Sequence, residues 1–287
     1  MSQHPRPRPA VAYVTSHRAP DAEVAVALAA FERAGLTAEA AVWDDPAVQW
    51  ERYAAAVVRS TWDYPTRRPE FLAWAHRAAG LTRLCNPAPV LERNTDKTYL
   101  RELSGAGVPV VPTVWVGPGE QLGDAVAPWP ELVVKPAVSV GARDTLRTSE
   151  RAAAVAHAAA LAAAGRTAMV QPYLSMVEGE GETSLLFLGG EFSHAVRRGP
   201  MLAGADGGFA DETRQPDADQ LAVAEQVLAA LPERADLLYA RVDLVRGTDG
   251  APLLIELELT EPRLFLHHHP DAADRLAAAL RSRIDRA

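Results

Sequence analysis

The stretch Ala251–Leu259, APLLIELEL, places two carboxylates two residues apart within an apolar run. Because side chains i and i+2 of a β-strand project from the same face, Glu256 and Glu258 can converge on one point. A second β-rich run, YARVDLV, contains Asp243, and the short GTDG between the two runs predicts a hairpin loop. The pattern therefore predicts antiparallel neighbours whose three carboxylates bind magnesium, with a solvated acidic strand face as the alternative.

The composition predicts a well-packed protein with two or three subdomains. The chain has 287 residues, of which 48% are hydrophobic, and this is ample for a real core. A formal net charge of -8 argues against binding a nucleic acid backbone as the main task. Cys85 is the single cysteine, which excludes an intramolecular disulfide and a zinc site built on cysteines, and favours a reducing cytoplasm. No apolar run approaches the roughly 18 residues of a spanning helix, so we expect a soluble protein without a membrane partner.

The first part of the chain alternates between predicted strands and predicted helices. After a short leader rich in proline and arginine, strands are predicted at Ala10–Ser16, Thr37–Trp43 and Tyr53–Ser60. Helices are predicted at Asp21–Ala34 and Glu70–Ala79. Such alternation predicts a parallel sheet.

Two loops are candidates for contact with a ligand. RSTWDYP, Arg59–Pro65, follows a predicted strand at the edge where open α/β sheets present ligand-contacting loops. Its aromatic residues Trp62 and Tyr64 have packing as the alternative role. Gly199–Pro216 is long and rich in glycine, which is typical of a mobile cover over a ligand, and a plain surface loop is the alternative.

Lysines at two positions indicate anion binding. Thr95 or Asp96 is predicted to cap a helix with Lys97 in its first turn, so this lysine either meets an anion at the helix N-terminus or points into water. Lys135 closes a predicted strand, and small residues in the following turn let backbone N–H groups approach phosphate oxygens closely. These small residues are Ser139, Gly141 and Ala142. Neither a Walker loop nor a complete nucleophile elbow is present, so Ser139 is a weak nucleophile candidate.

The next predicted strands carry an unusual density of polar residues. Ala168–Leu174 is predicted as a strand that enters a proline turn, and GETSLLFLGGEFSHAVRR is predicted as a hairpin. The polar residues that stand off the apolar faces are Gln171, Glu182, His194, Arg197 and Arg198. Because neighbouring residues of a strand point oppositely, only one of the two arginines can serve a site. For the run His267–His269 we prefer an exposed or packing role to metal binding, because adjacent residues rarely chelate one ion.

In their order along the chain, these motifs resemble the ATP-grasp superfamily. Within it, RSTWDYP, KPAVSVGARDTLR, VQPYL, GGEFSHAVRR and RVDL…IELELTEPRLFL resemble the group of the cycloserine-forming O-ureidoserine cyclo-ligase and related glutathione-synthetase-like enzymes. The resemblance runs over nearly the whole chain. It implies an α/β and α+β protein with the ATP-grasp fold: an N-terminal pre-grasp domain with a parallel sheet at residues 1–88, and an ATP-grasp domain at 89–287. A small nucleotide-lid subdomain is expected at about 109–171, and the remainder is expected to bind metal and substrate.

The resemblance also implies roles for individual residues. The expected ATP-binding residues are Lys97, Lys135, Ser139, Gly141, Ala142, Gln171, Pro172, Tyr173, Leu174 and Glu182. The expected metal ligands are Asp243, Glu256 and Glu258, which would hold two Mg²⁺ ions with Mn²⁺ as an accepted substitute, although many relatives have Asn in place of Glu258. Arg241 and Arg197 are the expected catalytic arginines. The expected substrate contacts are Arg59, Ser60, Thr61, Trp62, Asp63 and Arg263.

The function implied is that of an ADP-forming ligase that makes a C–N bond and depends on ATP and magnesium. A carboxylate or carbonyl oxygen of a small amino-acid-like substrate would attack the γ-phosphate, and an amine would take the resulting acyl phosphate. The product is either a ring, as in antibiotic biosynthesis of the cycloserine type, or an intermolecular amide. A small-molecule kinase on the same scaffold and a non-catalytic nucleotide-binding module are the alternatives. We expect a monomer or a homodimer, with a small-molecule substrate as its partner.

Overall fold

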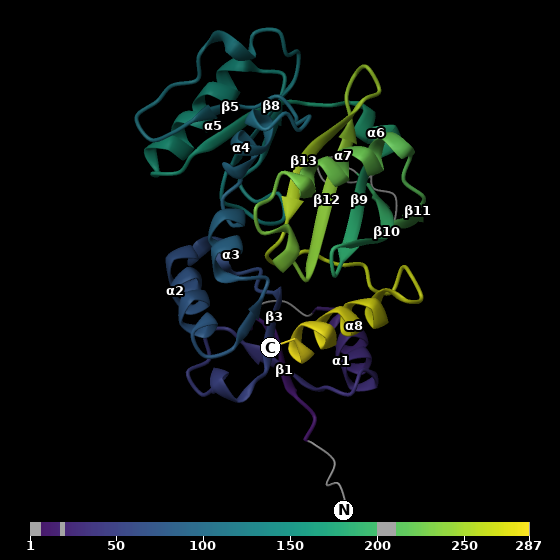
Figure 1. Ribbon diagram of the computed structural model, residues 1–287. Helices are drawn as coiled ribbons and strands as arrows, with labels where there is room; N and C mark the ends of the chain where they lie inside the picture. Colours follow the sequence, from purple (N-terminus) through teal and green to yellow (C-terminus); the bar gives the residue numbers. More distant parts are fainter. Residues whose placement is uncertain (1–6, 18–20, 200–210, 287) are drawn as a thin grey trace, which may run out of the picture.

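The N-terminal part of the protein is a parallel sheet covered by helices on both faces (Figure 1). The computed structural model describes residues 7–17, 21–199 and 211–286. The strands of the first sheet lie in the order β2-β1-β3-β4 and pair in parallel, which confirms the sequence prediction. Their bounds are β1 (Ala10–Thr15), β2 (Thr37–Val42), β3 (Ala55–Ser60) and β4 (Arg83–Cys85). The helical segments of this part are α1 (Val24–Arg33), η1 (Trp50–Arg52), η2 (Tyr64–Thr66) and α2 (Arg68–Ala79).

Alternation along β1 divides its side chains between two cores. Val11 and Tyr13 pack in the core that includes residues of α1 and of the C-terminal helix α8 (Ala272–Asp285). Ala12 and Val14 pack on the opposite face, in the core that includes residues of α2. The last helix of the chain lies against α1 (Figure 1), so the C-terminal segment helps to form the core on one face of the N-terminal sheet.

A second sheet is antiparallel and has the order β5-β8-β6-β7. Helix α5 covers it, and the small side chains of Ala154 and Ala158 in this helix are fully buried in the core beneath. The strands are β5 (Val114–Val116), β6 (Leu132–Pro136), β7 (Leu146–Thr148) and β8 (Ala168–Pro172), and the helical segments are η3 (Asp124–Val126) and α5 (Arg151–Ala163).

The third sheet is antiparallel and has the order β11-β10-β9-β12-β13. Its strands are β9 (Glu182–Leu188), β10 (Glu191–Arg198), β11 (Glu212–Arg214), β12 (Tyr239–Arg246) and β13 (Pro252–Glu258), with helical segments α6 (Met176–Glu180), α7 (Ala218–Ala229) and η4 (Arg234–Asp236). Strands β12 and β13 form the predicted hairpin, in which Asp243 lies opposite Glu256 and Arg241 opposite Glu258. All three acids of the opening motif are therefore on adjacent strands.

Two local predictions were wrong. Lys97 is not in the first turn of a helix but between α3 (Ala88–Asn94) and α4 (Tyr99–Gly105), because the Asp96 carboxylate accepts the backbone N–H of Thr98 at 3.0 Å in a turn. Part of the predicted loop 199–216 is strand β11, which pairs with β10. Residues 200–210 of that loop lie outside the described part of the chain. Within the described ranges, no helix has the length and apolarity needed to cross a membrane.

Candidate active site

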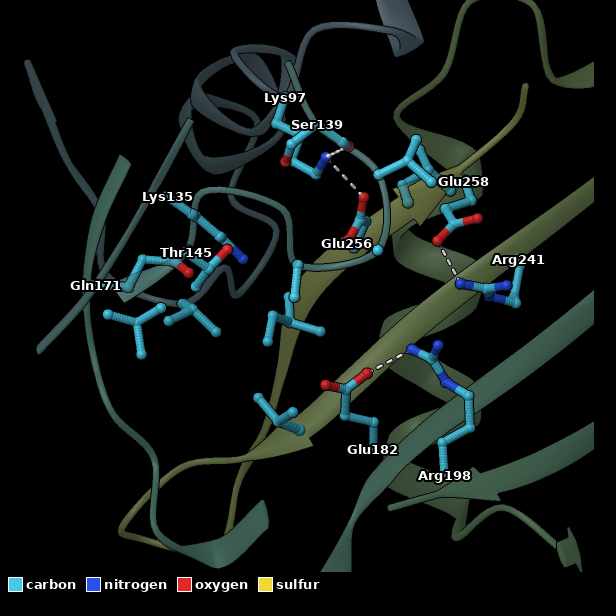
Figure 2. A pocket seen from close by; sticks show the side chains of 18 of the residues that line it. Lys97, Lys135, Ser139, Thr145, Gln171, Glu182, Arg198, Arg241, Glu256 and Glu258 are labelled. Carbon is cyan, nitrogen blue, oxygen red and sulfur yellow. Dashed lines mark hydrogen bonds and ion pairs between the residues drawn. The ribbon is translucent and has the colours of Figure 1, made fainter. Parts of the chain in front are cut away.

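A cavity of about 480 Å³ lies between the second and third sheets, and Trp62 and Tyr64 of the N-terminal part contribute to its wall. Strands β6 and β8 supply one side, and β9, β12 and β13 supply the other. All the residues predicted to bind ATP line this cavity: Lys97, Lys135, Ser139, Gly141, Ala142, Gln171, Pro172, Tyr173, Leu174 and Glu182. Residues that are far apart along the chain, such as Lys97, Lys135 and Glu182, therefore line the same cavity (Figure 2).

Both lysines of the sequence line the cavity. The Lys97 Nζ donates to the Ser139 carbonyl at 2.7 Å and pairs with the Glu256 Oε1 at 3.1 Å (Figure 2). Burial opposes the charge of Lys97, but Glu256 outweighs it and raises the pKa of this lysine. Lys135 has no ion-pair partner among the described residues, and burial lowers its pKa. A bound anion beside Lys135 would offset the cost of burying its charge.

The loop after Lys135 has a strained backbone. Ala142 and Asp144 have positive φ values of 55° and 58°, as does Gly141 at 67°, and non-glycine residues in this region are concentrated at functional sites. Arg166 holds the base of the loop through a 2.7 Å ion pair with Asp144. The loop thus keeps a conformation in which its backbone faces the cavity next to both lysines.

The lining also includes an apolar surface that the sequence analysis did not single out. Aliphatic side chains from five segments contribute to it: Val111, Val133, Val177, Val245 and Ile255. Near them, the Gln171 side-chain amide donates to the Thr113 hydroxyl at 2.9 Å. An apolar slot with a fixed amide at its edge suits a flat heterocyclic base. No sequence signal identifies such residues, because they read as ordinary core positions.

Arg197 does not reach the cavity, whereas its neighbour Arg198 does. The guanidinium of Arg197 donates to the carbonyl of Gly179, and also to that of Glu180 at 2.8 Å. Arg198 points the other way and pairs with Glu182 (Figure 2). Alternation along β10 accounts for this division, so of the two neighbouring arginines it is Arg198, and not the predicted Arg197, that lines the cavity.

The three predicted metal ligands do not assemble into a metal site. Asp243 is fully buried, and its oxygens accept from Ser184 at 2.7 Å, Arg198 at 3.0 Å and Arg241 at 2.8 Å. Despite its burial, the two arginines hold the pKa of Asp243 below its ordinary value. Over the described ranges, no three His, Cys, Asp or Glu side chains form a group that could hold a metal ion.

Glu256 and Glu258 do line the cavity, and their chemistry fits Mg²⁺. Glu258 pairs with Arg241 (Figure 2). Burial raises the pKa of Glu258 to about 7, with Arg241 opposing the shift and Glu256 adding to it. Glu256 and Glu258 could therefore hold Mg²⁺. The Asp243 carboxylate instead pairs with Arg241 and Arg198.

Comparison with known proteins decides the family. Residues 11–86 match the family model described as the N-terminal domain of D-cycloserine synthetase DcsG. The cycloserine biosynthesis protein DcsG of Streptomyces lavendulae is 41% identical over 276 residues, which are 90% of this chain and 92% of that protein. The chain belongs to the DcsG family. A crystal structure of D-cycloserine synthetase DcsG has a TM-score of 0.88 at 38% identity and covers 96% of this chain and 99% of that one.

More distant structures share the fold alone. A RimK domain ATP-grasp protein from Sphaerobacter thermophilus has a TM-score of 0.69 at 22% identity and covers 94% of this chain and 98% of that one. A D-alanine–D-alanine ligase from Bacillus anthracis has a TM-score of 0.66 at 14% identity and covers 97% and 99%. This member of the DcsG family therefore has the ATP-grasp fold and is an ATP-grasp ligase, as the motifs predicted.

In this DcsG-family ligase, few of the predicted substrate residues contact the cavity. Trp62 and Arg263 line it. Ser60 and Asp63 instead bond within the N-terminal part, the Ser60 hydroxyl to Thr15 at 2.9 Å and the Asp63 carboxylate to the Trp43 indole at 3.0 Å. Arg59, Ser60, Thr61 and Asp63 are all buried and absent from the cavity wall. They lie in or just after β3, which is buried on both faces of its sheet.

Arg59 forms a buried ion pair with Glu23 at 3.0 Å. Replacement of Arg59 by methionine is expected to lower the free energy of unfolding by about 3–5 kcal/mol, because Glu23 is left as a buried, uncompensated charge. Urea unfolding at neutral pH measures this loss, and the double variant Glu23→Gln/Arg59→Met is expected to recover part of it. Unchanged stability with a weakened affinity for substrate would instead assign Arg59 to substrate binding.

Two further residues of the cavity wall are Tyr64, whose loop was predicted to contact a ligand with packing as the alternative, and Glu261, which was not predicted as a site residue. Burial raises the pKa of Tyr64 well above its ordinary value, and the neighbouring Glu261 adds to the shift. Burial also raises the pKa of the Glu261 carboxyl to about 8, and Glu258 adds to the shift. Glu261 is part of the quoted stretch IELELTEPRLFL, but it follows the end of β13, so the alternation of the strand does not single it out.

Proposed function

We propose that this ligase closes a ring within a small amino acid, as in cycloserine formation, by activating the substrate carboxylate with ATP. The observation that carries the proposal is the cavity itself. Lys135, which has no ion-pair partner among the described residues, a strained loop of small residues and an apolar surface lie in its wall together with Glu182, Glu256, Glu258 and Glu261. Similarity over nearly the whole length to D-cycloserine synthetase DcsG supports the choice of product.

For ATP, we propose that Lys135, Lys97 and the backbone of Ser139–Ala142 bind the phosphates. The aliphatic slot and the segment Gln171–Leu174 would hold the adenine, and Glu182 would accept the ribose hydroxyls. Glu256 and Glu258 would hold Mg²⁺, which when bound neutralises charge on the phosphates. We further propose that the site holds two Mg²⁺ ions and that Mn²⁺ can replace them.

The chemistry needs no protein nucleophile. A substrate carboxylate oxygen attacks the γ-phosphate, which leaves ADP and an acyl phosphate, and a nitrogen of the same substrate then attacks the acyl carbon and expels phosphate. In O-ureidoserine that nitrogen is the one bonded to the side-chain oxygen, so its attack closes a five-membered ring. Arg241 and Arg198 would stabilise charge on the transferring group, because both guanidiniums face the cavity and are held by Asp243.

We also propose that the chain forms two domains, a pre-grasp domain at residues 1–88 and an ATP-grasp domain at residues 89–287. The second would include a nucleotide-lid subdomain at about 109–171. Supporting this, the first sheet ends with β4 at Cys85, and the match to the N-terminal domain of DcsG ends at residue 86. The second sheet spans Val114–Pro172. Its attachment through the cavity-lining strands would let the lid cover bound ATP.

The test is a screen of amino acids and their ureido and hydroxamate derivatives, with ADP, phosphate and product mass followed together. We expect one ADP and one phosphate for each O-ureido-D-serine consumed, with a cyclic product. ADP formation with the phosphate retained on the substrate would make the protein a small-molecule kinase. Absence of ADP with every carboxylate substrate would count against a ligase of this class.

A further inference from the structure

The charged side chains that line the cavity are nearly all paired with one another. Lys97 pairs with Glu256 at 3.1 Å and Arg263 pairs with Asp211 at 3.2 Å. Arg198 pairs with Glu182, and Arg241 pairs with Glu258 (Figure 2). Among the described lining residues, this leaves one cation and one anion without an ion-pair partner, namely Lys135 and Glu261.

These two residues have different charged neighbourhoods. The charges that act on Lys135 are Glu256, Lys97 and the proposed ribose acid Glu182. Those that act on Glu261 are Glu258, Lys97 and Glu256. Glu261 follows the end of β13, the strand that carries Glu258, whereas Glu182 lies on β9, and β12 separates these two strands. Trp62 of the N-terminal part, which also lines the cavity, donates to the Glu261 carbonyl at 3.0 Å.

Since the proposed function already gives Lys135 a phosphate to bind, Glu261 is the ionisable group of the described cavity wall left without an ion-pair partner. Burial disfavours its ionised form, and a cationic group on the other substrate would stabilise that form. We propose that Glu261 binds the α-ammonium group of the amino acid substrate. The proposal rests on the proposed function, because it places the substrate carboxylate near the γ-phosphate and its ammonium at Glu261. The Tyr64 hydroxyl interacts with the Glu261 carboxyl, which has further acceptor capacity for an ammonium.

The turn that carries Glu261 is fixed from several directions. Four consecutive backbone carbonyls, those of Thr260, Glu261, Pro262 and Arg263, each accept a hydrogen bond from a different side chain. The donors are Tyr239 at 2.8 Å, Trp62 at 3.0 Å, Arg59 at 2.7 Å and Arg241 at 3.2 Å, respectively. A carboxylate held on such a turn is preorganised, so little ordering is needed when an ammonium binds.

This network also gives the loop RSTWDYP a function in recognition. Arg59 and Trp62 hold the turn through its carbonyls, and Tyr64 holds the Glu261 side chain. The N-terminal part of the chain therefore acts on the substrate mainly through the position of Glu261. Arg59 and Trp62 are positioning residues in this account.

The variant Glu261→Gln tests the proposal in the full-length protein saturated with ADP and Mg²⁺. Calorimetry is expected to show binding of O-ureido-D-serine weakened roughly 10- to 150-fold, because a charge-assisted hydrogen bond is lost. The desamino analogue of the substrate, which lacks the α-amine, is expected to bind wild type and variant equally. The affinity for ADP is expected to stay within about 3-fold of wild type, since Glu261 faces the amino acid.

Equal weakening for the amino substrate and its desamino analogue would overturn the proposal, as would unchanged affinity for both. Tyr64→Phe keeps the charge and is expected to weaken the amino substrate less than Glu261→Gln does. Because the readout is binding, a protein that bound the amino acid through Glu261 but formed no ring would contradict the proposed function alone. If wild type bound neither compound, both proposals would fall.

Discussion

Replacement of Lys135 by alanine is expected to weaken ATP binding by about 30- to 150-fold, the equivalent of about 2–3 kcal/mol for a lost charged hydrogen bond. The expectation follows from the position of Lys135, which lines the cavity without an ion-pair partner among the described residues and whose pKa is lowered by burial. Its charge is desolvated in the free protein and would be compensated by phosphate oxygens. Calorimetric titration with a non-hydrolysable ATP analogue measures the effect.

Arg151→Ala is the matched control, because it removes a cation from the same subdomain at an exposed position on α5. We expect its affinity for nucleotide to equal that of wild type. If Lys135→Ala bound the ATP analogue as tightly as wild type, the assignment of the phosphates to Lys135 and its loop would be wrong.

Glu256→Gln is expected to raise the Mg²⁺ concentration needed for half-maximal ADP formation by about 100-fold or more, since even residues that only support a metal ligand cost 10- to 100-fold when removed. Glu256 lines the cavity and is held by Lys97 at 3.1 Å. The substitution keeps the shape of the side chain and removes the charge that Mg²⁺ prefers. The measurement is the rate of ADP release across a magnesium titration at saturating ATP.

Glu32→Gln serves as control, because Glu32 is an exposed glutamate on α1 of the N-terminal part. Its magnesium dependence should match that of wild type. An unaltered magnesium requirement in Glu256→Gln would remove this residue from the metal site and direct attention to the other acids of the cavity.

The ion pairs of Asp243 explain why it does not line the cavity with Glu256 and Glu258, the other two predicted metal ligands. Spacing along the sequence placed Asp243 beside Glu256, and the strand register agrees. Spacing cannot show that Arg241 and Arg198 converge on the Asp243 carboxylate from β12 and β10. Such cross-strand contacts depend on the order of strands in the sheet, which a local pattern does not contain.

The residues proposed to bind ATP were easier to predict from the sequence. Lys135 and the small residues after it form one continuous segment, so their proximity is guaranteed by the chain itself. The parallel sheet of the N-terminal part was also predictable, because predicted strands and helices alternate along this part of the chain. Strand β3 is buried on both faces, and its first four residues are apolar. Lys97 reached the cavity as expected, although from a turn between helices and not from a helical first turn.

The substrate side was the least predictable. Glu261 lies beyond the end of a strand, and its role depends on donors from distant segments, Arg59 and Trp62 on one side and Tyr239 on the other. The loop RSTWDYP was expected to touch substrate directly, yet most of it is buried and supports the turn 260–263. A residue that acts through another leaves no pattern in its own neighbourhood of the sequence.

If the site activates a substrate carboxylate as an acyl phosphate, one carboxylate oxygen must leave with the released phosphate. Transfer of labelled oxygen therefore tests the proposed function most directly. O-ureido-D-serine labelled with the heavy oxygen isotope in both carboxylate positions is incubated with ATP, Mg²⁺ and the protein, and the released phosphate is analysed by mass spectrometry. The account predicts that each phosphate carries one labelled oxygen from the substrate. Phosphate released without label, at a rate matching ADP formation, would contradict it.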